Sequence, residues 1–271
     1  MMRLSFLAPL LALGLYAPAA FGQGSVFDEA EVIFLGETHD NPAHHARQAE
    51  LVRELQPTAL VFEMLTTDQS AQIRPGDVED EVALAERLDW ENTGWPDFSM
   101  YYPIFAAAPE AAIFGAELPR AEARAAQDRP LDAIFGPSAG FYALDKPLPP
   151  EQQEEREALQ AAAHCDALPD DMLPVMVGIQ RLRDARLAET ALEALAMHGA
   201  PVVVITGNGH ARTDWGAPAL VAMAAPEVKV AALGQGEDGG DPGGSFDVVE
   251  QSEGVADRED PCAAFEDSTG N

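Results

Sequence analysis

Five short apolar runs divide the chain, and each one stops at a glycine or a glutamate. They occupy residues 32–35, 59–62, 111–116, 201–206 and 228–233. Runs of this length that are rich in β-branched side chains are typical of strands buried on both faces of a parallel sheet. Stretches of strong helix formers lie between them. Strands that alternate with helices predict an α/β fold, with a mostly parallel sheet flanked by helices.

One connection is much longer than the others. Residues 121–197 are too many for a plain crossover, and the two longest helical stretches, residues 151–164 and 170–198, fall mostly within them. We expect this insertion to form a helical cap over the carboxyl edge of the sheet. Residues 128–150 are rich in Pro and Gly and are predicted to form a loop or lid.

Two local patterns add further elements. Asp40 or Asn41 followed by Pro42 is typical of a helix N-cap with proline in the first turn, which predicts a helix over residues 43–55. Residues 246–249 alternate in polarity after a Gly- and Asp-rich turn. This pattern predicts an edge strand that pairs antiparallel with the strand before it.

The two ends of the chain differ from its middle. Residues 1–22 have the parts of a secretory signal, namely Arg3, an apolar run and small residues around Gly22. We therefore expect cleavage near Gly22, a periplasmic or secreted protein with no direct membrane span, and a folded domain over residues 23–250. Residues 251–271 are acidic and poor in large apolar side chains, which predicts a disordered tail unless Cys262 fixes it.

The charge and the cysteines bear on partners and compartment. The formal net charge is −30, and such a surface repels nucleic acid and anionic membranes. Cys165 and Cys262 are the two cysteines, and an even count in an oxidising compartment suggests a disulfide between them. Two free thiols, or Cys165 as a metal ligand, are the alternatives.

Polar side chains follow four of the predicted strands at the point where each strand ends. They are Glu37 with His39, Glu63, Glu117, and His210 with Arg212. The carboxyl ends of neighbouring parallel strands lie about 5 Å apart, so these groups can converge. Two histidines with several carboxylates suit either a divalent metal or general acid–base chemistry.

Each of these residues also has a structural interpretation. Glu63 and Glu117 can cap the helices that follow them, and His39 can hold its own turn. His44 and His45 point to different sides of a helix, so at most one is expected to face the site and the other to lie at the surface. Six aromatic residues gather within residues 90–105, and part of this cluster is expected to pack in the core.

Several segments together resemble the ChaN-like haem-binding proteins, a branch of the Tiki and erythromycin-esterase-like superfamily. The resemblance covers roughly residues 28–235. The segments are GETHDNPAHH (36–45), FEM (62–64), the aromatic cluster, GAELPR (115–120), QRLRDARLAE (180–189) and ITGNGHAR (205–212). The resemblance implies an α/β core with a helical cap, export to the cell envelope and a role in haem or iron uptake.

The resemblance also implies a site and partners. The pocket would contain Glu37, His39, Glu63, Arg183, Asp184, His210 and Arg212. Haem would be held by a tyrosine ligand between paired subunits, with Tyr101 or Tyr102 as the first candidates and Tyr142 as the second. A homodimer and an outer-membrane haem or iron receptor are the implied protein partners. Glu117 stands where the family's GANxPR element has asparagine.

Other superfamily members imply an alternative, a metal-dependent hydrolase acting on esters or peptides. Glu37, His39, Glu63 and His210 would then be the catalytic residues or ligands of a divalent metal. Glu37 or His39 would activate water, and Arg212 would stabilise an oxyanion. A non-catalytic protein whose polar strand ends are purely structural is the third hypothesis.

Overall fold

The structure is a computed structural model, which describes residues 26–74, 76–260, 262 and 263. The predicted signal sequence, residues 1–22, and the end of the predicted tail, from residue 264, lie outside the described residues. None of the described helices is long and apolar enough to cross a membrane.

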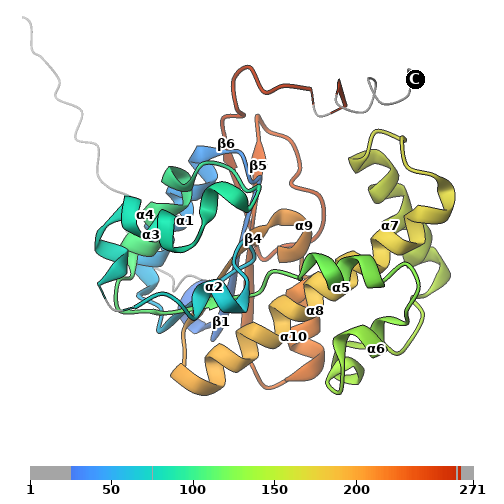
Figure 1. The fold of residues 1–271 in the computed structure, drawn as a ribbon, viewed down its shortest axis with the longest axis horizontal. Coiled ribbons are helices and arrows are strands. Elements are labelled where there is room, and N and C mark those ends of the chain that lie inside the picture. The colour runs from blue at the N-terminus through green and yellow to red at the C-terminus, as the bar shows by residue number, and fades with distance from the viewer. Residues whose placement is uncertain (1–25, 75, 261, 264–271) are drawn as a thin grey trace, which may run out of the picture.

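A sheet of six parallel strands forms the centre of the molecule, in the order β3-β2-β4-β1-β5-β6 (Figure 1). β1 pairs with β4 on one side and β5 on the other. The α/β fold and its parallel sheet are confirmed. The strands are β1 (Val32–Glu37), β2 (Ala59–Phe62), β3 (Ala112–Gly115), β4 (Val202–Gly207), β5 (Val230–Glu237) and β6 (Val248–Ser252).

The direction predicted for the last strand is wrong, because β6 runs parallel to β5. The ten residues between the two strands return along β5, so that the backbone N–H of Asp247 bonds the carbonyl of Ala232. β6 then begins opposite Leu233 and proceeds in the same direction as β5. A turn that only reversed the chain would have given the antiparallel pairing.

Helices cover both faces of the sheet. Ile33 and Leu35 face one layer, which includes α1, α3 and α4, while Val32 and Phe34 face α8 and α10 on the other side. The first layer contains η1 (Val26–Glu29), α1 (Pro42–Leu55), α2 (Thr67–Ser70), η2 (Asp77–Glu79), α3 (Glu81–Arg87), η3 (Trp90–Asn92) and α4 (Phe98–Ala107). The second contains α5 (Arg120–Ala125), α6 (Leu131–Phe135), η4 (Ala139–Tyr142), α7 (Pro150–Ala163), η5 (Asp170–Met172), α8 (Leu173–His198), α9 (Asn208–Ala211) and α10 (Ala217–Ala224).

The predicted cap divides into two parts. α5, α7 and the first half of α8 border a cavity at the carboxyl edge of the sheet. The second half of α8 packs on the sheet itself, with Ala188 and Ala191 fully buried. The predicted loop over residues 128–150 contains two short helices, α6 and η4.

α1 begins as its sequence predicts, and Asn41 is the cap. Its side chain accepts a hydrogen bond from the backbone N–H of Ala43 at 2.8 Å, and Pro42 occupies the first turn. The expectation that one of the next two histidines lies at the surface is wrong. His44 and His45 are both fully buried, because Thr38 and His39 cover the start of α1 and bond their ring nitrogens.

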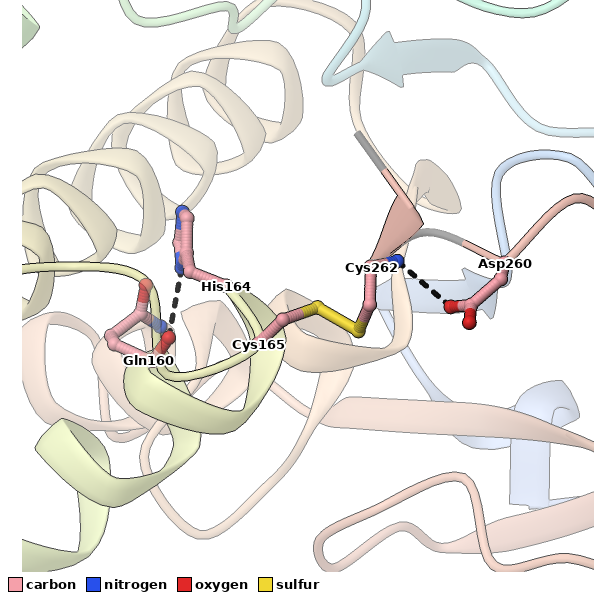
Figure 2. The surroundings of a disulfide bond; sticks show 5 residues. All are labelled: Gln160, His164, Cys165, Asp260 and Cys262. Carbon is pink, nitrogen blue, oxygen red and sulfur yellow. Dashed lines mark hydrogen bonds between the residues drawn. A yellow bond between two sulfur atoms is a disulfide. The ribbon is translucent and has the colours of Figure 1, made fainter. Parts of the chain in front are cut away.

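A disulfide joins Cys165, just after α7, to Cys262, with a Cα–Cα distance of 5.6 Å (Figure 2). The chain before Cys262 is also fixed by charge, since the Arg258 guanidinium bonds Asp40 and Glu237 at 2.7 Å. Residues 251 and 252 belong to β6, so the boundary predicted before residue 251 falls inside a strand.

Candidate functional site

A cavity of about 830 Å³ opens at the carboxyl edge of the sheet. The polar residues that follow the strands meet there, as predicted: Glu37 ends β1, Glu63 follows β2, Glu117 follows β3 and His210 lies in α9 after β4. Neither Glu63 nor Glu117 is a helix cap, because Thr66 caps α2 and Pro119 precedes α5.

Glu37 is the centre of a buried hydrogen-bond network. Its Oε1 accepts from the Tyr101 hydroxyl at 3.0 Å and from Nδ1–H of His39 at 2.8 Å. Its Oε2 lies 3.4 Å from Nδ1 of the buried His45. The Glu37 carboxylate therefore orients the His39 ring through Nδ1, and the Tyr101 hydroxyl orients the carboxylate.

Glu63 forms the second buried carboxylate site. Its Oε2 accepts from the Thr206 hydroxyl and from the backbone N–H of Gly207. Burial alone would raise the pKa of Glu63, but the positive charges of His210 and His39 and these hydrogen bonds lower it to about 2. Glu63 is therefore a carboxylate at neutral pH.

Both histidines of the cavity are paired with carboxylates through Nδ1. His210 Nδ1 donates to Asp184 Oδ1 at 2.6 Å, and its Nε2 lies 3.7 Å from Glu63 Oε1. Burial lowers the pKa of His210, but the charges of Glu63 and Asp184 outweigh it and the net pKa is raised. Burial also lowers the pKa of His39, but the hydrogen bond to Glu37 and the charge of Glu63 outweigh it and raise the pKa to about 9.

The two predicted arginines, Arg212 and Arg183, differ in the interactions that they make within the protein. Arg212 makes two hydrogen bonds of 2.6 Å to Asp214, and its guanidinium lies 3.5 Å from the ring centroid of Trp215. Arg183 makes one hydrogen bond of 3.4 Å to Gln180 and no ion pair within the part of the chain that the structure describes. Arg183 is thus the more available cation.

Arg156 of α7 was missed by the sequence analysis. Its guanidinium lies 4.0 Å from Asp184 and 5.0 Å from the ring centroid of Trp215, and only 8% of the residue is exposed. Its Nε has no hydrogen-bond partner among the described residues. In the sequence it stands in a run of charged residues on a helix, a pattern usually found on a solvated face, so no local signal marks it.

None of the described tyrosines, which were the predicted haem ligands, lines the cavity of the single chain. Tyr101 is fully buried, with its hydroxyl bonded to Glu37. Tyr102 donates to the carbonyl of Val78 beside the core, and Tyr142 packs edge-on against Phe135. Most of the aromatic cluster is core, and Trp95 is its one member among the lining residues.

The predicted metal donors do not converge on a common point. No group of three or more His, Cys, Asp or Glu side chains among the described residues is arranged to hold a metal ion. The predicted set of Glu37, His39, Glu63 and His210 is instead joined in internal pairs, such as the one between Glu37 and His39. This arrangement does not support a divalent metal site made from these four donors.

The family comparison decides the identity of the chain. Residues 25–221 match the family described as haem-binding uptake, Tiki superfamily, ChaN. The chain belongs to this family. No curated protein sequence matches it.

One solved structure of a ChaN protein has a similar fold, and two others align more weakly. The chain is 20% identical to ChaN of Campylobacter jejuni, determined in a study of cofacial haem binding, with a TM-score of 0.61 over 82% of this chain and 88% of that one. The type III effector HopBA1 aligns with a TM-score of 0.43 and 14% identity, over 83% and 88% of the two chains. A mutant of the erythromycin esterase EreC in its open conformation aligns with a TM-score of 0.45 and 14% identity, over 78% of this chain and 71% of that one.

We expect this ChaN-family chain to lose stability in acid through Glu63. The pKa of Glu63 is depressed to about 2, so its stabilising contribution is present above the ordinary value of 4.5 and is lost as the pH falls between the two. The free energy of unfolding, measured in urea from about pH 5 to about pH 3, should decline. A Glu63→Gln variant lacks this carboxyl and should decline less; equal declines would contradict the assignment.

Proposed function

We propose that this ChaN-family protein binds haem in the cavity at the carboxyl edge of its sheet. The observation that carries the proposal is the combination of a cavity of about 830 Å³ with a mixed apolar and cationic lining. Cofactor sites are concave, largely apolar and supplied with a few placed polar groups, and their volumes lie between about 300 and 1,000 Å³.

The lining suits the two chemical parts of haem. Apolar side chains for the porphyrin come from several parts of the chain: Trp95, Leu118, Leu159, Val177, Leu187 and Trp215. Cations for the two propionates come from Arg120, Arg156 and Arg183. The half-buried Glu117 lies within the electrostatic reach of Arg120 and Arg183, which offset its charge. The overall negative charge opposes approach, but salt screens it beyond about 10 Å.

The proposed setting is an exported protein of a haem or iron uptake or handling system. The leader-like residues 1–22 and the disulfide between Cys165 and Cys262 support export, since disulfides persist in oxidising compartments. A second copy of the chain and an outer-membrane receptor are the partners that we propose for this setting. Fractionation of cells would locate the protein, and its presence in the cytoplasm alone would contradict export.

A visible-absorbance titration with ferric haem tests the proposed ligand. The mature, metal-free protein should give a saturable Soret change at a defined stoichiometry. Weak absorbance that rises without saturation would contradict haem binding. Bovine serum albumin is unsuitable as a negative control because it has its own haem affinity, so the heat-unfolded chain should serve instead.

Replacing Arg183 by methionine should weaken haem binding about tenfold or more, because a charge-assisted hydrogen bond to a propionate contributes about 1.5–3 kcal/mol. Arg124→Met is the matched control, since Arg124 is exposed on α5 and changes the net charge equally. Haem dimethyl ester should bind the Arg183→Met variant and the native protein alike. Equal affinity of both proteins for ordinary haem would contradict this role of Arg183.

A hydrolase is the second candidate, favoured by the two pairs of histidine and carboxylate. His39 with Glu37 and His210 with Asp184 line the cavity together with Glu63. A histidine held by a carboxylate is suited to acid–base catalysis, and the raised pKa of both rings favours the role of general acid. Screening ester and peptide substrates, with and without manganese or zinc, tests this function. Absence of any turnover that depends on His39 would contradict it.

A further inference from the structure

Arg156 of α7 is a buried cation that the rest of the chain compensates poorly. Only 8% of the residue is exposed, and the Asp184 carboxylate lies 4.0 Å away and already accepts a hydrogen bond of 2.6 Å from His210. Arg156 donates one long hydrogen bond, of 3.4 Å, to the carbonyl of Trp215, and its Nε–H has no acceptor within the described part of the chain. An unpaired charge in the interior is costly, so this guanidinium is suited to an anion from outside the chain.

Gln160 presents an unused acceptor from the same side of α7. It lies four residues after Arg156, and residues at this spacing share one face of a helix. Both residues line the cavity. The Oε1 of Gln160 is buried and accepts no hydrogen bond from the described residues, and the bond from His164 goes to the backbone carbonyl of Gln160 instead (Figure 2). A donor without an acceptor and an acceptor without a donor therefore face the cavity together.

The lining of the cavity is positive, although the whole chain has a formal net charge of −30. His39 is protonated at neutral pH, because its pKa is raised to about 9. Together with the arginines it outnumbers the lining carboxylates, and such a local field favours an anionic ligand. The charged lining residues are Arg120, Arg156, Arg183 and Arg212 against Glu37, Glu63, Glu117 and Asp184.

The two unpartnered atoms define the chemistry of the ligand. It must accept a hydrogen bond from Arg156 and donate one to Gln160. Monohydrogen phosphate does both at neutral pH, because it has acceptor oxygens and one O–H. Sulfate and ionised carboxylates have acceptors only. A propionate of haem can therefore replace such an anion at Arg156 but leaves Gln160 without a donor.

We propose that Arg156 and Gln160 form a subsite for a small protonated oxyanion of the monohydrogen phosphate type, which occupies the haem-free cavity. The inference goes beyond the proposed function, because it does not require that haem binds. It also assigns a role to the face of α7 that covers the cavity.

Isothermal titration calorimetry of the haem-free, mature protein with inorganic phosphate, at constant ionic strength, tests the subsite. Native protein should bind phosphate saturably, and Arg156→Met should bind it about tenfold more weakly or worse. Arg124→Met is the matched control, because Arg124 is exposed, lies outside the lining and changes the net charge equally. Heat that does not saturate with the native protein, or equal affinity in Arg156→Met, would overturn the proposal.

Thermal unfolding distinguishes a lost site from a misfolded variant. Phosphate should raise the Tm of the native protein and leave that of Arg156→Met unchanged. In phosphate-free buffer Arg156→Met should unfold no earlier than the native protein, because an apolar side chain in place of a poorly compensated buried charge is often neutral or stabilising. A phosphate-dependent rise of equal size in both proteins would contradict the role of Arg156.

Gln160 has two readouts of its own. Sulfate and propionate, which lack the proton, should bind the native protein about fivefold more weakly than phosphate. Gln160→Glu should abolish phosphate binding, because the new carboxylate neutralises Arg156 in place of the ligand. Equal binding of the three anions, or native phosphate affinity in Gln160→Glu, would overturn the subsite. Failure of haem to bind would overturn the proposed function alone, since none of these measurements uses haem.

Discussion

Replacing Glu63 by glutamine should lower the free energy of unfolding by about 3 kcal/mol at neutral pH. The shift of its pKa from 4.5 to about 2 measures how strongly the folded protein favours the charged carboxylate. Glutamine keeps the shape of the side chain but removes the negative charge that faces His210 and His39. Urea unfolding of the two proteins measures the difference.

Glu117→Gln is the control for this substitution. Glu117 follows the neighbouring strand, is only half-buried and accepts no hydrogen bond from the described residues. Burial raises the pKa of Glu117, so its charge is not favoured by the fold. This variant should change the free energy of unfolding by less than about 0.5 kcal/mol. Equal effects at the two positions would mean that the network around Glu63 has no special role.

Replacing Gly115 by alanine should lower the free energy of unfolding by about 3 kcal/mol or more. A Cβ at this position would lie 2.2 Å from the carbonyl oxygen of Thr66 and 2.6 Å from that of Leu65. Both are backbone atoms, and the Leu65 carbonyl also accepts a hydrogen bond from the N–H of Glu117. The end of β3 would have to move away from the chain that crosses it, and the residues of the cavity wall would move with it.

Gly140→Ala is the control for the glycine. A Cβ at Gly140 meets no atom within 4 Å, and the residue is exposed. This variant should unfold within about 0.5 kcal/mol of the native protein. Thermal and urea unfolding of both variants would distinguish a steric effect at Gly115 from a general cost of the substitution. A Gly115→Ala variant as stable as the native protein would show that the backbone at Leu65 and Thr66 can move aside at little cost in free energy.

The sheet and the location of the site could be predicted because both depend on local patterns. Uninterrupted apolar runs such as residues 201–206 fit only strands covered on both faces, and parallel strands bring their carboxyl ends to one edge. This places Glu37 and Glu63 together without any knowledge of tertiary contacts. The convergence of four strand ends on one cavity follows from the topology alone.

The remaining features depend on contacts between distant segments. The path of the loop before β6 decides its direction, and Arg156 becomes part of the cavity only because α7 folds over the sheet. Tyr101 lies within an aromatic cluster in the sequence, but the packing of α4 against α1 turns it inward to Glu37. Burial of a single side chain within such a cluster has no signature in the local sequence.

The most direct measurement is a crystal structure of the mature protein with ferric haem, with anomalous scattering recorded at the iron edge. The account predicts one iron peak within the cavity, with the propionates directed to the arginines of α7 and α8. An iron peak on the outer surface, away from the cavity, would contradict it.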